Sequence, residues 1–336
     1  MKRRGKARFL ADGVLLVDKP AGPTSHDVVE RLRRRLIPER VGHTGTLDPF
    51  ATGLLVLAFN QATRLSELIG GGAKLYRAEL ALGRATDTGD PTGQVVAEAA
   101  IPELTAEAVG AALKALEGQR MQAPPAYSAA KHQGRPLYAY ARDGVRVQKP
   151  PRPITVHQAE LMALAPGVVT FEMLCSRGAY VRALGEELAQ ALGGVGHLRA
   201  LRRLASRPFA VAEAIGMDEA LDLAPEELAQ RLVPLAETLD RCGLPVAQVD
   251  DDLAWGLRQG RVLTREILMG DARGEHAAGL PFQVRDQAGG LVAVLRWLAP
   301  SEARRTREYE TIRVFPATDQ LGHGDMQPSA SAPGAE

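Results

Sequence analysis

Val41-Gly-His-Thr-Gly-Thr-Leu-Asp-Pro-Phe-Ala-Thr-Gly-Leu-Leu-Val-Leu57 is the most informative stretch of this sequence. Its glycines permit turns that a Cβ would hinder, and Pro49 biases Asp48 towards an extended or turning backbone. From Leu54 to Phe59 the residues are continuously apolar, which is typical of a strand covered on both faces. The stretch therefore predicts a small-residue loop that holds the Asp48 carboxylate at the mouth of a buried strand. Asp-Pro between glycines is also common turn chemistry, so spacing alone leaves a plain turn as an equal alternative.

The charge distribution favours a polyanionic partner. The 336 residues are 45% hydrophobic and 4% aromatic, and their net charge is +1. Residues 1–40 contain 11 Lys/Arg against 5 Asp/Glu, residues 131–152 contain 6 against 1, and residues 213–252 contain 2 against 11. Basic segments on a near-neutral chain are typical of proteins that bind nucleic acid. A solvated charged surface explains any single segment equally well.

The sequence argues against several other classes of protein. Cys175 and Cys242 belong to no CxxC pattern, and no HExxH pair is present, so neither a disulfide framework nor a structural metal site is indicated. No apolar run reaches the roughly 18 residues of a membrane span. The basic residues 1–12 indicate a nucleic-acid-facing arm rather than a signal peptide, because the apolar stretch is short and interrupted by Asp12. We therefore expect a cytoplasmic protein.

Residue periodicity predicts alternating strands and helices. Period-two patterns and apolar runs predict strands over 13–18, 54–59, 74–82, 94–97, 154–164 and 168–175. Helical spacing predicts helices after an N-cap at Thr24 or Ser25, over 105–117, and after Tyr180. From about residue 210 the chain is acidic and helix-prone, and residues 246–317 have the short apolar runs of a small β-rich module. Residues 318–336, rich in Gly, Ser, Pro and Ala, are predicted to be disordered.

The segment 42–55 resembles the catalytic-aspartate motif of the TruB family of pseudouridine synthases, which isomerise one uridine in the T-loop of tRNA. Further segments resemble other family motifs in the same order, so that the resemblance covers roughly residues 13–209. They are Lys19-Pro-Ala-Gly-Pro-Thr-Ser25, Lys74-Leu-Tyr76 with Leu82-Gly-Arg-Ala-Thr-Asp-Thr-Gly-Asp90, Pro124-Pro-Ala-Tyr-Ser-Ala-Ala-Lys131, Gly178-Ala-Tyr-Val-Arg182 and Leu201-Arg-Arg203. The chain departs from the family at Ala179, which replaces a threonine, and at Arg207, which replaces a glycine.

The resemblance implies an α+β fold, the pseudouridine synthase fold, with a mixed, mainly antiparallel sheet flanked by helices. It implies a catalytic domain over 13–245, including an RNA-gripping thumb at about 124–152. By position alone, residues 246–317 resemble the PUA-like RNA-binding domain of many bacterial members. The basic arm over 1–12 and the disordered tail over 318–336 would complete the chain.

The resemblance also implies roles for individual residues. Asp48 would act on the ribose, and Arg182 would pair with it. The substrate pocket would be formed by Tyr76, which stacks on the uracil, by Tyr180 and Leu201, and by His43, which fills the space left by the flipped base. Lys19 would lie near this pocket and buttress its packing. Phosphates would be held by Lys131, Arg142, Arg146, Arg202 and Arg203. The residues alone also allow simpler interpretations: Tyr76 in the core, His43 bonded to a loop backbone, and Lys19 on the surface.

The leading hypothesis is a monomeric enzyme that converts uridine 55 of the tRNA T-arm to pseudouridine without guide RNA, metal or cofactor. Guide-RNA-dependent relatives share the aspartate motif, but the extended sequence after Tyr127 favours the stand-alone type. A non-catalytic tRNA-binding or folding factor would share every basic and aromatic feature. A carboxylate hydrolase is less well supported, because no motif places a second carboxylate near Asp48. Attack at C1′ and abstraction of the C2′ proton both stay open.

Overall fold

The computed structural model describes residues 8–269, 279–298 and 308–317. The chain divides into two compact units, residues 1–233 and 234–336. This division lies earlier in the chain than the domain boundary expected at 245/246. The expected tail over 318–336 and the first seven residues of the expected basic arm lie outside the described residues.

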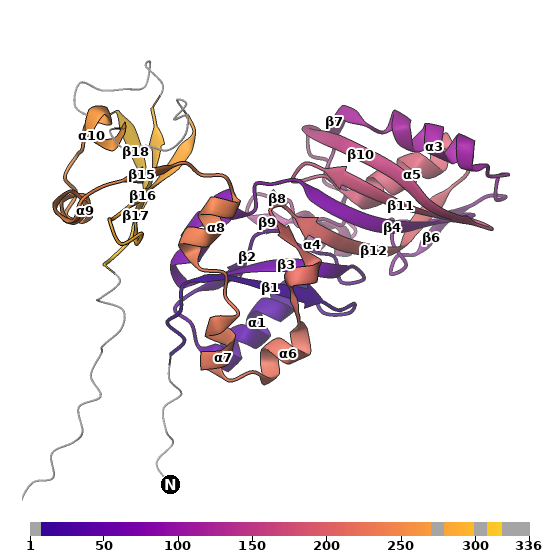
Figure 1. The fold of residues 1–336 in the computed structure, drawn as a ribbon. Coiled ribbons are helices and arrows are strands. Elements are labelled where there is room, and N and C mark those ends of the chain that lie inside the picture. Colours follow the sequence, from indigo (N-terminus) through magenta and orange to yellow (C-terminus); the bar gives the residue numbers. More distant parts are fainter. Residues whose placement is uncertain (1–7, 270–278, 299–307, 318–336) are drawn as a thin grey trace, which may run out of the picture. The chain divides into compact units, whose positions relative to one another are not determined.

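A mixed sheet organises the first unit (Figure 1). Its strands follow the order β14-β1-β3-β12-β4-β11-β10-β7, with β13 added beside β12 and β2 beside β3. Their bounds are β1 Gly13–Lys19, β2 Val41–His43, β3 Thr52–Phe59, β4 Lys74–Leu82, β7 Gly118–Gln122, β10 Arg152–Ala165, β11 Val168–Cys175, β12 Gly196–Ser206, β13 Phe209–Ala210 and β14 Ile215–Gly216. The β1–β14 and β3–β12 pairs are parallel and the other pairs are antiparallel. The mixed, mainly antiparallel sheet expected for the α+β fold is thus confirmed.

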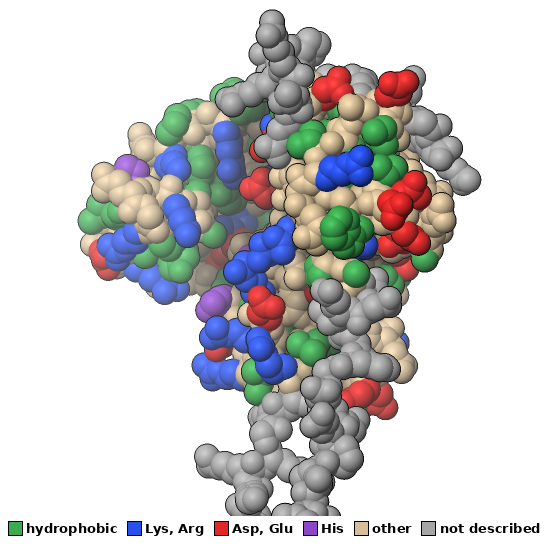
Figure 2. All heavy atoms as spheres, turned by 90° about the vertical axis from the view of Figure 1, so that its left-hand side faces the viewer, with side chains coloured by type: hydrophobic (Ala, Val, Ile, Leu, Met, Phe, Trp, Pro, Cys, Tyr) green, Lys and Arg blue, Asp and Glu red, His purple; other side chains and the backbone are tan. Residues whose placement is uncertain are grey.

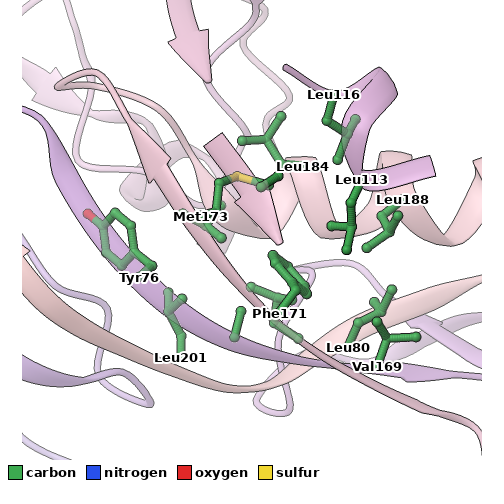
Figure 3. Packing of buried hydrophobic residues seen from close by; sticks show 14 of the residues in the cluster. Tyr76, Leu80, Leu113, Leu116, Val169, Phe171, Met173, Leu184, Leu188 and Leu201 are labelled. Carbon is green, nitrogen blue, oxygen red and sulfur yellow. The ribbon is translucent and has the colours of Figure 1, made fainter. Parts of the chain in front are cut away.

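Two hydrophobic clusters fasten helices onto this sheet. Helix α1 (Ser25–Leu36) begins with a capping box formed by Thr24 and Asp27, and buries its apolar face against β1 and β3. Helices α3 (Ala106–Ala115) and α5 (Val181–Ala191) pack on β4, β10 and β11. Figure 3 shows their leucines above Leu80, Val169 and Phe171 of the strands. Tyr76 and Leu201 lie at one end of this layer, with the tyrosine hydroxyl directed away from the cluster.

Shorter elements complete the first unit. Two small hairpins pair β5 (Arg84–Thr86) with β6 (Val95–Glu98), and β8 (Lys131–His132) with β9 (Arg135–Pro136). The remaining helices are α2 (Ser66–Ile69), α4 (Leu137–Arg142), α6 (Met217–Asp222) and α7 (Pro225–Gln230), with 3₁₀ turns at Asn60–Leu65 and Val211–Glu213.

The second unit is a small sheet domain. Its strands β15 (Val246–Gln248), β16 (Pro281–Arg285), β17 (Leu291–Trp297) and β18 (Tyr309–Val314) lie in sequence order. Its core stacks Phe282 on Trp297, with 4.7 Å between ring centroids. The unit also contains α8 (Leu235–Arg241), α9 (Asp251–Arg258) and α10 (Arg265–Met269). Arg285 binds α8 through Asp240 at 2.8 Å and the Ala236 carbonyl at 2.9 Å, which explains why the unit begins before the expected boundary.

None of the helices in the described residues has both the length and the apolar character that crossing a membrane requires.

Candidate active site

The glycine-rich stretch over residues 41–57 forms a hairpin. Residues 41–43 are strand β2 rather than loop, and His43 pairs with Leu57 of β3. The connecting loop carries Asp48 and is fastened to the start of α1, because the Ser25 hydroxyl accepts from the Leu47 amide at 2.8 Å and donates to its carbonyl at 3.0 Å. The Asp48 side chain stays 33% exposed, so a ligand can reach it.

Arg182 holds the Asp48 carboxylate. Its Nε donates to Oδ2 at 2.8 Å and its Nη2 to Oδ1 at 3.4 Å. The guanidinium is only 4% exposed and also donates to the carbonyls of Thr88 and Tyr127. Charge-assisted bonds from a side chain fixed in this way give the carboxylate a defined orientation. The expected pairing of Arg182 with Asp48 is therefore present.

Asp90, the last residue of the motif over 82–90, is a second carboxylate near Arg182, and no role was predicted for it. Its Oδ2 lies 3.8 Å from Arg182 Nη1, while its Oδ1 accepts from the Thr92 amide at 2.9 Å and from the hydroxyls of Thr88 and Thr92. Asp90 is buried, and its bonds stay within its own turn and Arg182. The available signal was an aspartate surrounded by threonines in a turn, a pattern that often stabilises turns without further purpose.

A cavity of about 450 Å³ opens beside Asp48, within the size range of small-molecule sites. It brings together most of the expected pocket residues. Its lining includes His43, Asp48, Tyr76, Tyr180, Arg182 and Leu201. Ala179, one of the departures from the family pattern, also lines it. Among the described residues, no cluster of three His, Cys, Asp or Glu side chains is arranged to hold a metal ion.

The two tyrosines of the cavity are held differently. Tyr76 is buried in β4, and burial raises the pKa of its hydroxyl, an effect that nearby Arg203 opposes. The Tyr180 main chain is held by the Gln122 side chain at 2.8 and 3.2 Å, and the Arg152 guanidinium lies 5.4 Å from its ring centroid. Gln122 and Arg152 were not anticipated, because no motif distinguishes them from other polar strand residues.

His43 lines the cavity in surroundings that favour the neutral imidazole. Burial lowers the pKa of its ring, and the positive charge of Arg203 lowers it further. Its Nδ1 is buried without a hydrogen-bond partner in the part of the chain that the structure describes. The simpler interpretation, a backbone hydrogen bond, is therefore not realised at this nitrogen.

The expected phosphate contact of Arg203 is wrong, and Lys19 has the packing role that the resemblance implies rather than a contact with substrate. Lys19 is fully buried behind the Asp48 loop, where its ammonium donates to the carbonyls of Pro20, Pro23 and Pro49, so it can neither bind substrate in the cavity nor lie on the surface. Arg203 is 1% exposed, with its guanidinium directed into the protein, so it cannot hold an external phosphate. Both cations are buried because backbone carbonyls converge on them, which no linear pattern reveals.

The other expected phosphate ligands lie on the surface, outside the cavity lining. Lys131, Arg142 and Arg146 are exposed, and Arg142 lies over the ring of Tyr138 at 5.4 Å. Arg202 is partly exposed and forms an ion pair with Asp18 at 2.6 Å. Figure 2 shows several Lys and Arg side chains close together in the lower left part of the view.

Comparison with known proteins identifies the family. The sequence model of the TruB family pseudouridylate synthase N-terminal domain matches residues 33–181. The tRNA pseudouridine synthase B of Syntrophotalea carbinolica is 40% identical over 310 residues, which cover 90% of this chain and 98% of that protein. The chain belongs to the TruB family of pseudouridylate synthases. It is therefore an isomerase.

Another TruB relative agrees with this assignment, and a solved structure shares the fold. The tRNA pseudouridine synthase B of Aromatoleum aromaticum is 42% identical over 256 residues, or 76% of this chain and 82% of that protein. The crystal structure of a Cbf5-Nop10-Gar1 complex contains a chain that matches with a TM-score of 0.70 and 24% identity, over 92% of this chain and 86% of that one. At this identity the structural match shows the fold alone, which is the expected pseudouridine synthase fold.

Proposed function

We propose that this enzyme converts uridine 55 in the T-loop of tRNA to pseudouridine without a guide RNA, and that Asp48 acts on the ribose of the flipped-out uridine. The observation that carries the proposal is the ion pair between Asp48 and buried Arg182 at the wall of the cavity. The names of the relatives, tRNA pseudouridine synthase B, support tRNA as the substrate.

The conversion of uridine to pseudouridine requires little more from the protein than a correctly oriented carboxylate. The C1′–N1 bond breaks, the uracil turns within the cavity, a C1′–C5 bond forms, C5 loses its proton and N1 gains one. An ionised Asp48 can attack C1′ or remove the C2′ proton, and Arg182 aims its oxygens in either case. Tyr76, Tyr180 and Leu201 supply flat or apolar walls that let the detached uracil rotate without leaving the cavity.

Binding would be electrostatic and would precede extraction of the target base, which costs a few kcal/mol of stacking. His43 is partly buried at the cavity in surroundings that favour the neutral imidazole, so it suits the space that the base leaves. Lys131, Arg142 and Arg146 lie in the expected thumb over 124–152, and Arg202 lies near the other side of the Asp48 loop. The second unit would add RNA contacts as a PUA-like domain, in a cytoplasmic monomer.

The test is tritium release from a tRNA transcript whose uridines are tritiated at C5, with purified protein and no other RNA. The proposal predicts release of one tritium per tRNA, and mapping of the product to uridine 55. A transcript carrying cytidine at position 55 is the matched control and should release none. Release that depends on an added guide RNA, or that maps elsewhere, would contradict the proposed specificity.

A further inference from the structure

Arg203 joins both ends of the loop that carries Asp48. Its Nη2 donates to the Gly45 carbonyl at 3.0 Å and its Nη1 to the Thr46 carbonyl at 3.3 Å, before Asp48. Its Nε donates to the Leu54 carbonyl at 2.6 Å, after Asp48. One planar guanidinium thus bridges the two sides of the loop from inside the protein.

The main chain of Arg203 also lies close to the residues that follow the Asp48 loop. In the parallel pairing of β12 with β3, Arg203 lies opposite Gly53, whose φ is +100°. A Cβ at Gly53 would lie 2.3 Å from the Arg203 carbonyl oxygen and 2.8 Å from its nitrogen. Only glycine permits this close approach of the two backbones. The pairing of Arg203 with Gly53 therefore fixes the register of β12 against β3, which follows the Asp48 loop.

The charge of Arg203 makes the arrangement hard to change. No ion pair to Arg203 is found within the described ranges. Its side-chain hydrogen bonds go to two loop carbonyls and to the Leu54 carbonyl of β3, with the Tyr76 hydroxyl also in reach. A buried cation must have its donors satisfied, because leaving it unpaired is very costly. Moving the loop away from β3 would remove the Gly45 and Thr46 acceptors at once, while the Leu54 acceptor stays on β3, so the loop is confined to the position seen here.

We propose that Arg203 is the positioning residue of the active site, which fixes the Asp48 loop and the Tyr76 hydroxyl relative to one another. This inference rests on the proposed role of Asp48. A lysine at the same place would keep the charge but not the planar fork, whose separate nitrogens reach Gly45 and Thr46 on one side and Leu54 on the other. The property to test is therefore the planar shape of the Arg203 guanidinium, with its positive charge kept.

The test compares Arg203→Lys with Arg77→Lys, since Arg77 lies on β4 beside β12 but is exposed and paired with Glu172 at 2.7 Å. Single-turnover tritium release and the tRNA Kd are measured for each, with wild type and Asp48→Asn alongside. We expect Arg203→Lys to bind tRNA as wild type does, while its rate constant falls by about 10²-fold, the usual effect of a small misplacement. Amide exchange in residues 44–52 should be faster in Arg203→Lys only.

The outcomes are distinguishable. A rate constant equal to that of wild type, or a loss confined to Kd, would overturn the positioning role. If Arg203→Lys does not melt cooperatively, Arg203→Gln is measured in the same way, and if neither variant folds, Arg203 is a residue of the core alone and the proposal is wrong. Absence of release from wild type would instead refute the proposed function, whatever the variants do.

Discussion

Arg182 Nε lies 2.8 Å from Asp48 Oδ2, although 134 residues separate the two in the chain. The contact forms because the β2–β3 loop and the start of α5 meet at one end of the sheet. Asp90 lies on another edge of the same guanidinium, at 3.8 Å. Arg182 is thus held between a buried carboxylate and a half-exposed one, and the half-exposed carboxylate faces the cavity.

Replacing Arg182 with lysine should damage catalysis and spare binding. An ammonium cannot contact both Asp48 oxygens and the Tyr127 carbonyl, so the carboxylate loses its orientation. We expect the single-turnover rate constant to fall on the order of 10²-fold at an unchanged tRNA Kd. Arg120→Lys, which alters an ion pair with Glu187 outside the cavity, is the control. A weaker Kd with a normal rate constant would show that Arg182 serves binding instead.

Gly53→Ala should destabilise the protein. At φ +100° a Cβ is strained by about 1–3 kcal/mol, and contact with the Arg203 backbone adds to this. Gly216→Ala is the matched control, because its φ is −62° and no atom lies within 4 Å of the added Cβ. Urea denaturation measures both variants, and equal free energies of unfolding would contradict the close β3–β12 approach.

Lys74 should make stability depend on alkaline pH. Its ammonium is buried, bonded to the carbonyls of Gly70 and Gly72, and burial together with Arg203 lowers its pKa to about 8. Between that value and about 10.5 the unfolded chain binds more protons than the folded one, so stability rises with pH across this window.

Lys74→Met removes this titration. The free energy of unfolding of wild type should therefore increase relative to that of Lys74→Met as the pH is raised from 7 to about 10, measured by urea denaturation. Lys114→Met, at an exposed lysine paired with Glu117, should follow wild type. Parallel pH profiles for wild type and Lys74→Met would refute the depressed pKa.

Removing the thumb charges should weaken binding without slowing chemistry. If Lys131 and Arg146 contact phosphates, each alanine variant should reduce the slope of log Kd against log salt by roughly 0.7 to 0.9. The rate constant at saturating tRNA should stay that of wild type, because neither residue lines the cavity. Arg77→Ala should leave the slope unchanged. Unchanged slopes in the thumb variants would place the RNA elsewhere.

Local patterns in the sequence predict most of the fold. The alternation of residues 74–82 predicts the strand and its buried face, and the sequence predicts an N-cap at Thr24 or Ser25, of which the structure has Thr24. Both features depend on neighbours in the chain. The resemblance to the family motifs predicts that Asp48, Tyr76, Tyr180 and Arg182 share one pocket, and all four line the cavity.

The failures concern buried polar groups. The two-residue period of a strand puts Arg202 and Arg203 on opposite faces of β12. No pattern in the sequence indicates which of the two side chains points inward, or that three backbone carbonyls accept hydrogen bonds from Arg203. Lys19 and Asp90 are similar cases, since their partners come from turns whose conformations are fixed only in the folded protein.

The central claim, that Asp48 performs the isomerisation, is tested most directly by single-turnover tritium release from tRNA with wild type and Asp48→Asn. Asparagine keeps the shape and a hydrogen-bonding oxygen for Arg182 but can neither attack C1′ nor accept the C2′ proton. We predict release by wild type, none by Asp48→Asn, and equal tRNA binding by both. Release by Asp48→Asn at the rate of wild type would contradict the assignment of Asp48, and tight binding without release from either protein would leave a tRNA-binding factor.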